Sequence, residues 1–380
     1  MLAPLAGFRR LRPGRRPPGE PRTILLLRLE RIGDLLMTLG AMRAIRFCAP
    51  RAQITLVVGS WNEAVARLIP GIDHVEMLDM PWLARGARPV GLAHLLGAGR
   101  RWRRRRFDLA VNFEGDIRSN VLVWFSGAAR RVGFGMAGGG PLLTDCVPYD
   151  PSAHVAANAM RLVERSFGAP LAALAEPREE SARLSVPAEA HARAADLLGR
   201  DPIRGPLIGI HASGGREIKQ WAPARFAEVA ARLARSHAAR IVLTGSAADR
   251  ALVDRLKAAL PAEVPFRDLA GDHDLVTLAA VIERSNVFVT SDTGPMHLAA
   301  AVGTPIVALF GPSDPRRWGP LAADSRIIRI DLPCSPCNRI RRPPDRCVGH
   351  VPDCLAGIDA ARVYDAVVAT LEERRSTGTG

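Results

Sequence analysis

Short apolar runs alternate with amphipathic stretches in the first half of the chain. An apolar run at residues 23–28 precedes a helical pattern whose apolar positions, Leu35 to Ile45, share one broad face, and residues 53–58 form a second run. Runs of this length are typical of strands buried on both faces of a parallel sheet. The pattern predicts a strand–helix–strand unit, and residues 109–113 and 131–134 are further strand candidates.

The same alternation starts again beyond residue 206. Apolar runs and helical patterns follow one another here, and we predict strands at 207–210, 241–244, 287–290 and 305–310 and helices at 223–237, 249–260 and 296–302. Strands that alternate with helices form parallel sheets covered by helices on both faces. The fold class is therefore α/β, with two Rossmann-like, doubly wound domains.

The length of the chain and a proline-rich stretch near its middle indicate two domains. At 380 residues it is too long for one ordinary core. A Pro-punctuated, Ala-rich stretch at 181–205 is expected to be a linker plus one helix, between an N-terminal domain at 23–180 and a C-terminal domain at 206–375. Residues 1–22 are rich in Arg, Pro and Gly, and we expect a disordered basic arm there.

Composition restricts the partners and the compartment. Lys and Arg number 52 against 38 Asp and Glu, a formal charge of +14 that favours polyanions such as nucleic acid, anionic membrane or phosphorylated sugars and lipids. No apolar run is long enough for a spanning helix, and no secretory signal is recognised. Six cysteines without an export signal favour a reducing compartment, so a cytoplasmic protein is expected.

The segment at 291–297 carries the clearest candidate site. Its sequence, Ser-Asp-Thr-Gly-Pro-Met-His, joins a predicted strand to a short helix, which is where open α/β sheets bind ligands. Thr293 and Gly294 fall at the helix start, where free backbone N–H groups attract phosphate, while Asp292 and His297 flank them. An ordinary capping turn is the alternative interpretation.

A second loop, at 211–221, follows another predicted strand. Gly214 allows close approach of the backbone to a ligand, Ser213 offers a hydroxyl, and Lys219 offers a positive charge suited to a diphosphate. Alone, Lys219 would be taken for a solvated surface lysine. Together with the loop at 291–297 it becomes a candidate donor ligand.

The first strand–helix loop holds Gly33 and Asp34. A carboxylate at this position can cap the helix, and spacing alone favours that role. Neither a GxGxxG nor a Walker A pattern is present, so a dinucleotide or P-loop site gets little support.

Taken in order, these blocks resemble glycosyltransferase family 9, the family of the lipopolysaccharide heptosyltransferases. The resemblance spans roughly residues 23–371 and rests on blocks at 24–34, 211–221, 292–297 and 303–318. It implies the GT-B fold, with two Rossmann-like domains facing a central cleft. It also implies an inverting, metal-independent transfer of a heptose, or a related sugar, from ADP-heptose to a lipid-linked oligosaccharide of the lipopolysaccharide core.

The resemblance also implies residue roles. Asp34 matches the catalytic base, and the donor-binding positions match Ser213, Gly214, Lys219, Asp292, Thr293, Gly294 and His297. Arg118 and Ser119 resemble an acceptor-side pair. This sequence departs from the family pattern at Gly40, where Pro is usual, and in a 211–219 loop one residue longer than in some members.

Four cysteines near the C-terminus, Cys334, Cys337, Cys347 and Cys354, leave two interpretations open. The first pair has the spacing of metal ligands, but the second pair is not spaced as a zinc-ribbon knuckle. A structural zinc ion and reduced thiols are both compatible with the pattern, whereas no cofactor is expected to be required for catalysis.

The basic run at residues 100–106 is usually a solvated face, but it could also contact anionic lipid at the cytoplasmic face of the inner membrane. Trp102 is then expected at headgroup level. Three rival functions remain: a related transferase for another sugar or acceptor, a nucleic-acid-binding protein, and an inactive sugar-nucleotide sensor. No nucleic-acid-binding motif accompanies the charge, so no nucleic-acid partner is expected.

Overall fold

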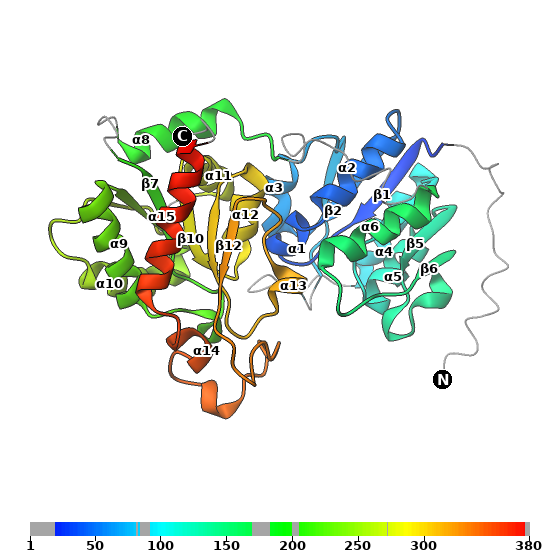
Figure 1. Cartoon of the computed structure of the whole chain (residues 1–380). Helices are drawn as coiled ribbons and strands as arrows, with labels where there is room; N and C mark the ends of the chain where they lie inside the picture. Colours follow the sequence, from blue (N-terminus) through cyan, green and yellow to red (C-terminus); the bar gives the residue numbers. More distant parts are fainter. Residues whose placement is uncertain are drawn as a thin grey trace. The chain divides into compact units, whose positions relative to one another are not determined.

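The structure, a computed structural model, describes residues 20–80, 83, 92–168, 183–199, 205–271 and 273–376. The chain divides into two compact units, residues 1–183 and 184–380 (Figure 1). Most of the predicted basic arm, residues 1–19, lies outside the described residues.

Unit 1 is built on a parallel sheet of six strands in the order β3-β2-β1-β4-β5-β6. The strands are β1 (Thr23–Leu27), β2 (Gln53–Val58), β3 (His74–Met77), β4 (Leu109–Asn112), β5 (Arg130–Phe134) and β6 (Asp145–Val147). The central strands β1 and β4 are fully buried apart from the first residue of β1, which explains their continuous apolar sequences.

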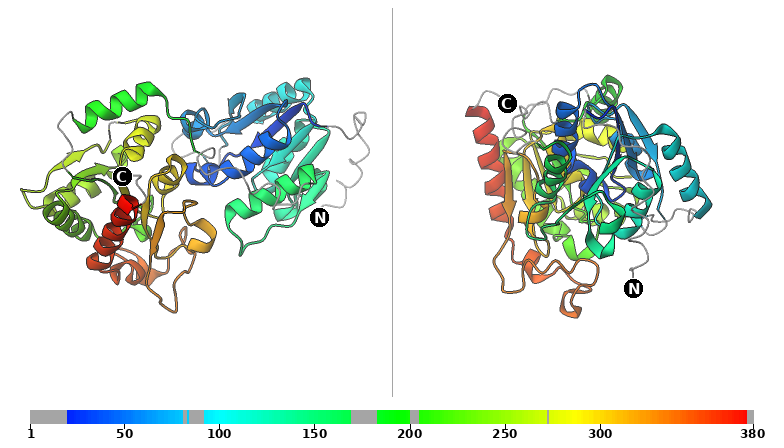
Figure 2. Two further views of the ribbon diagram at one scale, coloured as in Figure 1. Left: turned by 45° about the horizontal axis from the view of Figure 1, so that its top comes forward. Right: turned by 90° about the vertical axis from the view of Figure 1, so that its right-hand side faces the viewer.

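Helices cover both faces of this sheet. They are α1 (Ile32–Leu36), α2 (Leu39–Cys48), α3 (Glu63–Ala66), α4 (Leu92–Arg105), α5 (Ile117–Phe125) and α6 (Val155–Phe167). Side chains of α4 and α5 pack on one face. The helices α2 and α6 pack beside each other, and Figure 2 shows the helices of this unit around its sheet. The single helical pattern predicted between residues 35 and 45 corresponds to two helices: α1 ends at Leu36, and α2 begins at Leu39.

Unit 2 repeats this architecture in the order β12-β11-β10-β7-β8-β9, again parallel throughout. Its strands are β7 (Leu207–His211), β8 (Arg240–Thr244), β9 (Phe266–Asp268), β10 (Val287–Ser291), β11 (Ile306–Leu309) and β12 (Ser325–Ile328). Numbered within each unit, both sheets have the strand order 3-2-1-4-5-6 of a Rossmann fold. The predicted α/β fold class is therefore confirmed.

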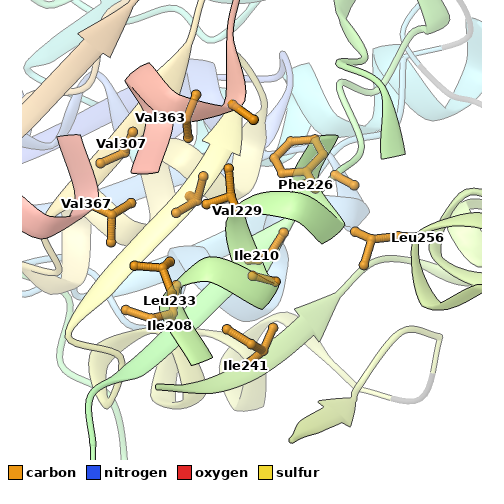
Figure 3. Packing of buried hydrophobic residues seen from close by; sticks show 14 of the residues in the cluster. Ile208, Ile210, Phe226, Val229, Leu233, Ile241, Leu256, Val307, Val363 and Val367 are labelled. Carbon is orange, nitrogen blue, oxygen red and sulfur yellow. The ribbon is translucent and has the colours of Figure 1, made fainter. Parts of the chain in front are cut away.

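The helices of unit 2 also form two layers. They are α8 (Ala188–Leu198), α9 (Pro223–His237), α10 (Arg250–Ala259), α11 (Leu275–Glu283), α12 (Gly294–Val302), α13 (Pro315–Trp318), α14 (Asp353–Ala356) and α15 (Ala360–Ser376). In the larger core, α9, α10 and α15 bury side chains such as Val229, Leu256 and Val363 against Ile208 and Ile241 of the sheet (Figure 3). On the other face, α8 and α11 pack together, so the helix of the predicted linker stretch lies on unit 2.

The strands that the apolar pattern did not predict all lie at sheet edges. β3, β6, β9 and β12 lie at the sheet edges and are partly exposed. An edge strand pairs with only one other strand and is partly exposed to solvent, so it keeps polar side chains. It therefore lacks the continuous apolar run that is typical of a central strand.

Chain order reverses beside the first strand of each sheet, between β1 and β4 in unit 1 and between β7 and β10 in unit 2. In open α/β sheets, ligands bind beyond the carboxyl ends of the strands at such a reversal. The loops that follow these four strands are therefore where a site is expected.

Candidate active site

The two predicted donor loops meet at the carboxyl edge of the sheet in unit 2. Lys219 ends a short 3₁₀ turn after β7, and Asp292 follows β10, the strand hydrogen-bonded to β7. The Lys219 Nζ donates to Asp292 Oδ2 at 3.1 Å, with the two side chains 16% and 13% exposed. Strand pairing thus joins a cation and a carboxylate that lie far apart in the sequence.

The N-terminus of α12 lies beside this ion pair in the chain. Thr293 is the N-cap residue with extended backbone angles, Gly294 and Pro295 open the first turn, and the cap has no side-chain hydrogen bond. Backbone N–H groups at such a terminus, together with the helix dipole, attract a negatively charged group. The buried His297 lies one turn into the helix. The predicted placement of Thr293 and Gly294 at the helix start is confirmed, and the helix ends at Gly303, which has left-handed backbone angles.

The loop after β7 folds back tightly on itself. A Cβ atom on Gly214 would lie 2.5 Å from the carbonyl oxygen of Lys219, so only glycine fits this approach. Ser213 is buried, and its Oγ accepts from the backbone N–H of Gly215 at 3.2 Å. Ser213 also hydrogen-bonds the carboxylate of Asp249. Its hydroxyl is therefore engaged within the protein, and the donor contact that the resemblance implies stays a prediction.

Asp249 is a residue that the sequence analysis missed. It accepts hydrogen bonds from the backbone N–H of Ser246 at 2.8 Å and from the Ser246 hydroxyl at 2.6 Å, in a capping box after β8. Burial would raise the pKa of Asp249, but the hydrogen bonds from Ser213 and Ser246, with the nearby His211, hold it below its usual value. Asp249 thus fastens the β7 loop to the β8 loop. The Ser246-x-x-Asp249 spacing was the available signal.

His211, the last residue of β7, faces this same cluster. Its Nδ1 is 3.0 Å from the Thr244 Oγ1, and burial lowers the pKa of His211 to about 4. The imidazole is therefore neutral at pH 7. A neutral, buried ring supports the loop by packing and hydrogen bonding and supplies no charge to a ligand.

In unit 1, Asp34 lies in the first turn of α1, at the carboxyl end of β1. The N-cap residue of this helix, Arg31, makes no side-chain cap. The Asp34 carboxylate is 30% exposed, and its Oδ1 lies 3.4 Å from Nη2 of the buried Arg28. The Arg28 Nε also donates to the backbone carbonyl of Asp34 at 3.0 Å. A partly exposed carboxylate held by a buried guanidinium is oriented yet open to solvent.

Glu114 is the second residue that the sequence analysis missed. It follows β4, the strand beside β1, and its carboxylate is buried. Burial raises the pKa of Glu114 to about 7, an effect that Arg28 opposes and that Glu30 and Asp34 reinforce. An acidic residue just past the apolar run at 109–113 was the available signal.

The predicted acceptor-side pair is split between surface and core. Arg118 is half-exposed and pairs with Asp116, the N-cap residue of α5, at 2.9 Å. Ser119 is buried, and its Oγ donates to the Asp116 carbonyl at 2.7 Å and accepts from Asn112 Nδ2 at 3.0 Å. Arg118 remains accessible to a ligand, whereas Ser119 lies inside the domain.

The C-terminal cysteines lie within electrostatic reach of one another. Cys334 is exposed, Cys337 and Cys347 are partly buried, and Cys354 is buried. Burial, reinforced by the other three, raises the pKa of Cys354 to about 11. Across the described residues, no group of three or more His, Cys, Asp or Glu side chains could hold a metal ion. The two interpretations of these cysteines, a structural zinc ion and reduced thiols, therefore both stay predictions.

The basic run lies at the end of α4. Five arginines of this helix end and Arg106 are exposed, and Arg105 pairs with Glu76. The prediction that Trp102 lies at the surface is wrong: its ring is 1% exposed, and its Nε1 donates to Glu76 Oε2 at 2.8 Å. Trp102 faces the sheet because the apolar face of α4 packs on that side. Within the described residues, no helix is long and apolar enough to cross a membrane.

Comparison with known proteins identifies similar sequences and folds. The profile of the family described as Glycosyltransferase family 9 (heptosyltransferase) matches residues 96–346. Lipopolysaccharide heptosyltransferase 2 of Escherichia coli K12 is 28% identical over 315 residues, which cover 81% of this chain and 88% of that protein.

Two solved structures share the fold. The E. coli ADP-heptose lps heptosyltransferase II superposes with a TM-score of 0.75 at 24% identity, covering 93% of this chain and 99% of that chain. A glycosyl transferase family 9 protein from Veillonella parvula gives a TM-score of 0.79 at 24% identity, covering 93% and 98%. The GT-B fold is thereby confirmed.

Proposed function

Since the chain belongs to glycosyltransferase family 9, we propose that it transfers a heptose, or a related sugar, from ADP-heptose to a lipopolysaccharide core acceptor. The observation that carries this proposal is the Lys219–Asp292 pair, from which the chain continues directly into the N-terminus of α12, a helix start without a side-chain cap. Such a combination suits a nucleotide diphosphate, because ammonium and backbone N–H groups both stabilise phosphate oxygens. The names of the E. coli relatives support the sugar and the acceptor.

In the proposed reaction, Asp34 accepts the proton of an acceptor hydroxyl as that oxygen attacks the anomeric carbon of the donor sugar. The bond from this carbon to the diphosphate breaks, and ADP leaves with the electron pair. Lys219 and the amides near Thr293 and Gly294 stabilise the charge that grows on the leaving diphosphate. A single displacement without a covalent intermediate inverts the anomeric centre. No step of the proposal uses a metal ion.

The test of this function is transfer by the purified chain. ADP-heptose is supplied with lipopolysaccharide cores that lack heptose or carry one, and the product is followed by mass spectrometry. We expect a mass increase of one heptose, which forms far more slowly in Asp34→Asn. The same cores offered with UDP- and GDP-sugars serve as donor controls. Transfer from those donors alone would replace ADP-heptose, and no transfer from any donor would overturn the function.

We also place the enzyme in the cytoplasm, at the surface of the inner membrane. A lipid-linked acceptor resides in a membrane, so the enzyme must reach that surface. The exposed arginines at the end of α4 supply a basic face for anionic headgroups. Peripheral attraction of this kind is reversible and depends on salt.

A further inference from the structure

Glu114 and the loop that carries Asp34 are joined by unusually direct contacts. The Glu114 Oε1 accepts from the backbone N–H of Leu29 at 2.6 Å and from that of Glu30 at 3.1 Å. These two residues immediately follow β1 and lead into α1. The Glu114 side chain therefore fastens the start of the loop to the end of β4.

The other oxygen of Glu114 faces Arg28. The Arg28 Nη1 is 3.5 Å from Glu114 Oε2 and donates to the Phe113 carbonyl at 3.0 Å. The same guanidinium contacts Asp34 twice, at its carbonyl and at its carboxylate. Arg28 thus spans from the end of β4 to Asp34, with Glu114 on one side and Asp34 on the other.

Glu114 is itself firmly supported. Its backbone N–H donates to Asn112 Oδ1 at 3.1 Å, and the Asn112 side-chain amide donates to Asn120 Oδ1 at 2.7 Å and to Ser119 Oγ at 3.0 Å. All three supporting side chains are buried. A network of satisfied, buried hydrogen bonds fixes its members in one arrangement, so Glu114 is a rigid anchor for the loop.

Keeping a carboxyl group at this depth opposes folding. Burial raises its pKa, and the charged groups that face it are one cation, Arg28, and two anions, Glu30 and Asp34. The contacts of its side chain go to the Leu29–Glu30 backbone and to Arg28. Every one of these contacts acts on the segment that ends at Asp34.

We propose that Glu114 is a positioning residue for the reaction: by accepting the two loop N–H groups and a contact from Arg28, it fixes the β1–α1 loop so that Asp34 meets the acceptor hydroxyl. The inference rests on the proposed function, in which Asp34 is the base. Glu114 acts through the length of its side chain and the geometry of its hydrogen bonds. Misplacement of a catalytic group by about 1 Å can lower the rate by roughly 100-fold.

Three substitutions separate the effect of side-chain length at position 114 from the effect of its charge. Glu114→Gln keeps an acceptor oxygen at the same reach and removes the charge, whereas Glu114→Asp keeps the charge and shortens the reach. Glu114→Ala removes both. Kcat and the KM values for donor and acceptor are measured for each variant as full chain. We expect Gln to keep most of the wild-type kcat, and Asp and Ala to lose roughly 10- to 100-fold with the donor KM nearly unchanged.

One control variant and one further measurement accompany these substitutions. Ser126→Ala removes another buried side chain that accepts from a backbone N–H, that of Ala128 at 3.2 Å. Ser126 precedes β5 and so lies at the amino ends of the parallel strands, whereas Glu114 follows β4 at their carboxyl ends. The Ser126→Ala substitution should lower stability and leave kcat unchanged. Hydrogen exchange of residues 28–36, measured on the same proteins, should speed up in Glu114→Ala and Glu114→Asp, not in Glu114→Gln or Ser126→Ala.

The outcomes separate this inference from its premise. If Asp34→Asn is inactive while Glu114→Ala keeps the wild-type kcat, the positioning role is overturned and the base assignment stands. If Glu114→Asp is active and Glu114→Gln is not, charge and not reach matters, which also overturns it. An active Asp34→Asn would remove the base and, with it, this inference. Should the Ala variant fail to fold, the Asp and Gln pair alone decides.

Discussion

The ammonium group of Lys219 lies 3.1 Å from the carboxylate of Asp292, and each residue belongs to the loop that follows one of two adjacent strands, β7 and β10. Asp292 holds the lysine chain over the carboxyl edge of the sheet, next to the start of α12 in sequence. The Lys219 side chain would already be ordered before a diphosphate binds, so it would lose less conformational entropy on binding.

Lys219→Ala is predicted to weaken ADP binding by about 1.5–3 kcal/mol, the range for a hydrogen bond to a charged group, or roughly 10- to 150-fold in Kd. Titration calorimetry measures it. Lys257→Ala is the matched control. Like Lys219, Lys257 pairs with aspartate, in its case with both Asp254 and Asp268, but it lies on α10. Equal affinity of wild type and Lys219→Ala would place Lys219 outside the donor site.

Asp34→Asn is predicted to lower kcat by roughly 10²- to 10⁴-fold, the usual contribution of a general base. The amide keeps the size of the side chain, so ADP affinity and melting temperature should change little. Steady-state kinetics with a saturating acceptor decides between roles. Full turnover together with a much lower melting temperature would favour helix capping as the role of Asp34.

Glu114 is predicted to make stability depend on pH. Its pKa is raised by burial to about 7 in the folded chain, against 4.5 ordinarily, so between these values the folded state binds more protons than the unfolded state. Stability then falls as pH rises through this window. Glu114→Gln removes this dependence. The melting temperature of the variant minus that of wild type should become more positive from pH 5 to pH 8, and a constant difference would contradict the raised pKa.

The C-terminal cysteines are predicted to differ in reactivity. Because burial and neighbouring thiols raise the pKa of Cys354 to about 11, it should react slowly with a maleimide at pH 7.5, and the exposed Cys334 should react fast. Peptide mapping by mass spectrometry resolves each site. Elemental analysis of the same sample is the control: one equivalent of zinc, with all four thiols protected and a chelator lowering the melting temperature, would show a structural metal.

Arginines at the end of α4 are predicted to drive binding to anionic vesicles. At about 1 kcal/mol per surface charge, three engaged arginines give roughly 3 kcal/mol. Binding should fade as the Debye length falls from about 10 Å at 0.1 M salt to about 3 Å at 1 M. Co-sedimentation with anionic and neutral vesicles measures it.

A matched pair of variants locates the surface of the protein that binds the membrane. One replaces four exposed arginines of the basic run by Gln: Arg100, Arg101, Arg103 and Arg104. The other replaces four exposed arginines of unit 2: Arg339, Arg341, Arg342 and Arg346. Only the first set should reduce binding. Equal losses would indicate net charge alone, and binding to neutral vesicles would contradict an electrostatic mechanism.

Local sequence determined the central elements of both sheets and several candidate residues. The apolar runs of β1, β4, β7 and β10 mark strands buried on both faces, because such strands meet no water along their length. Lys219 and Asp292 could be singled out because each follows such a strand within a loop of small residues. Their meeting needed the pairing of β7 with β10, which no local pattern encodes.

Tertiary structure decided which side chains are available for chemistry. Ser119 and Ser213 have residue types suited to ligand contact, yet both hydroxyls are buried and bonded within the protein. Trp102 stands among arginines in the sequence and faces the sheet in the fold. Glu114 acquires its importance from the strand order that sets β4 beside β1, and Asp249 from the order that sets β8 beside β7. The sequence pattern predicts the elements because the alternation of buried and exposed positions within a helix or strand is a property of neighbouring residues. The contacts of Glu114 and Asp249 arise only when strands that are distant in the sequence pair.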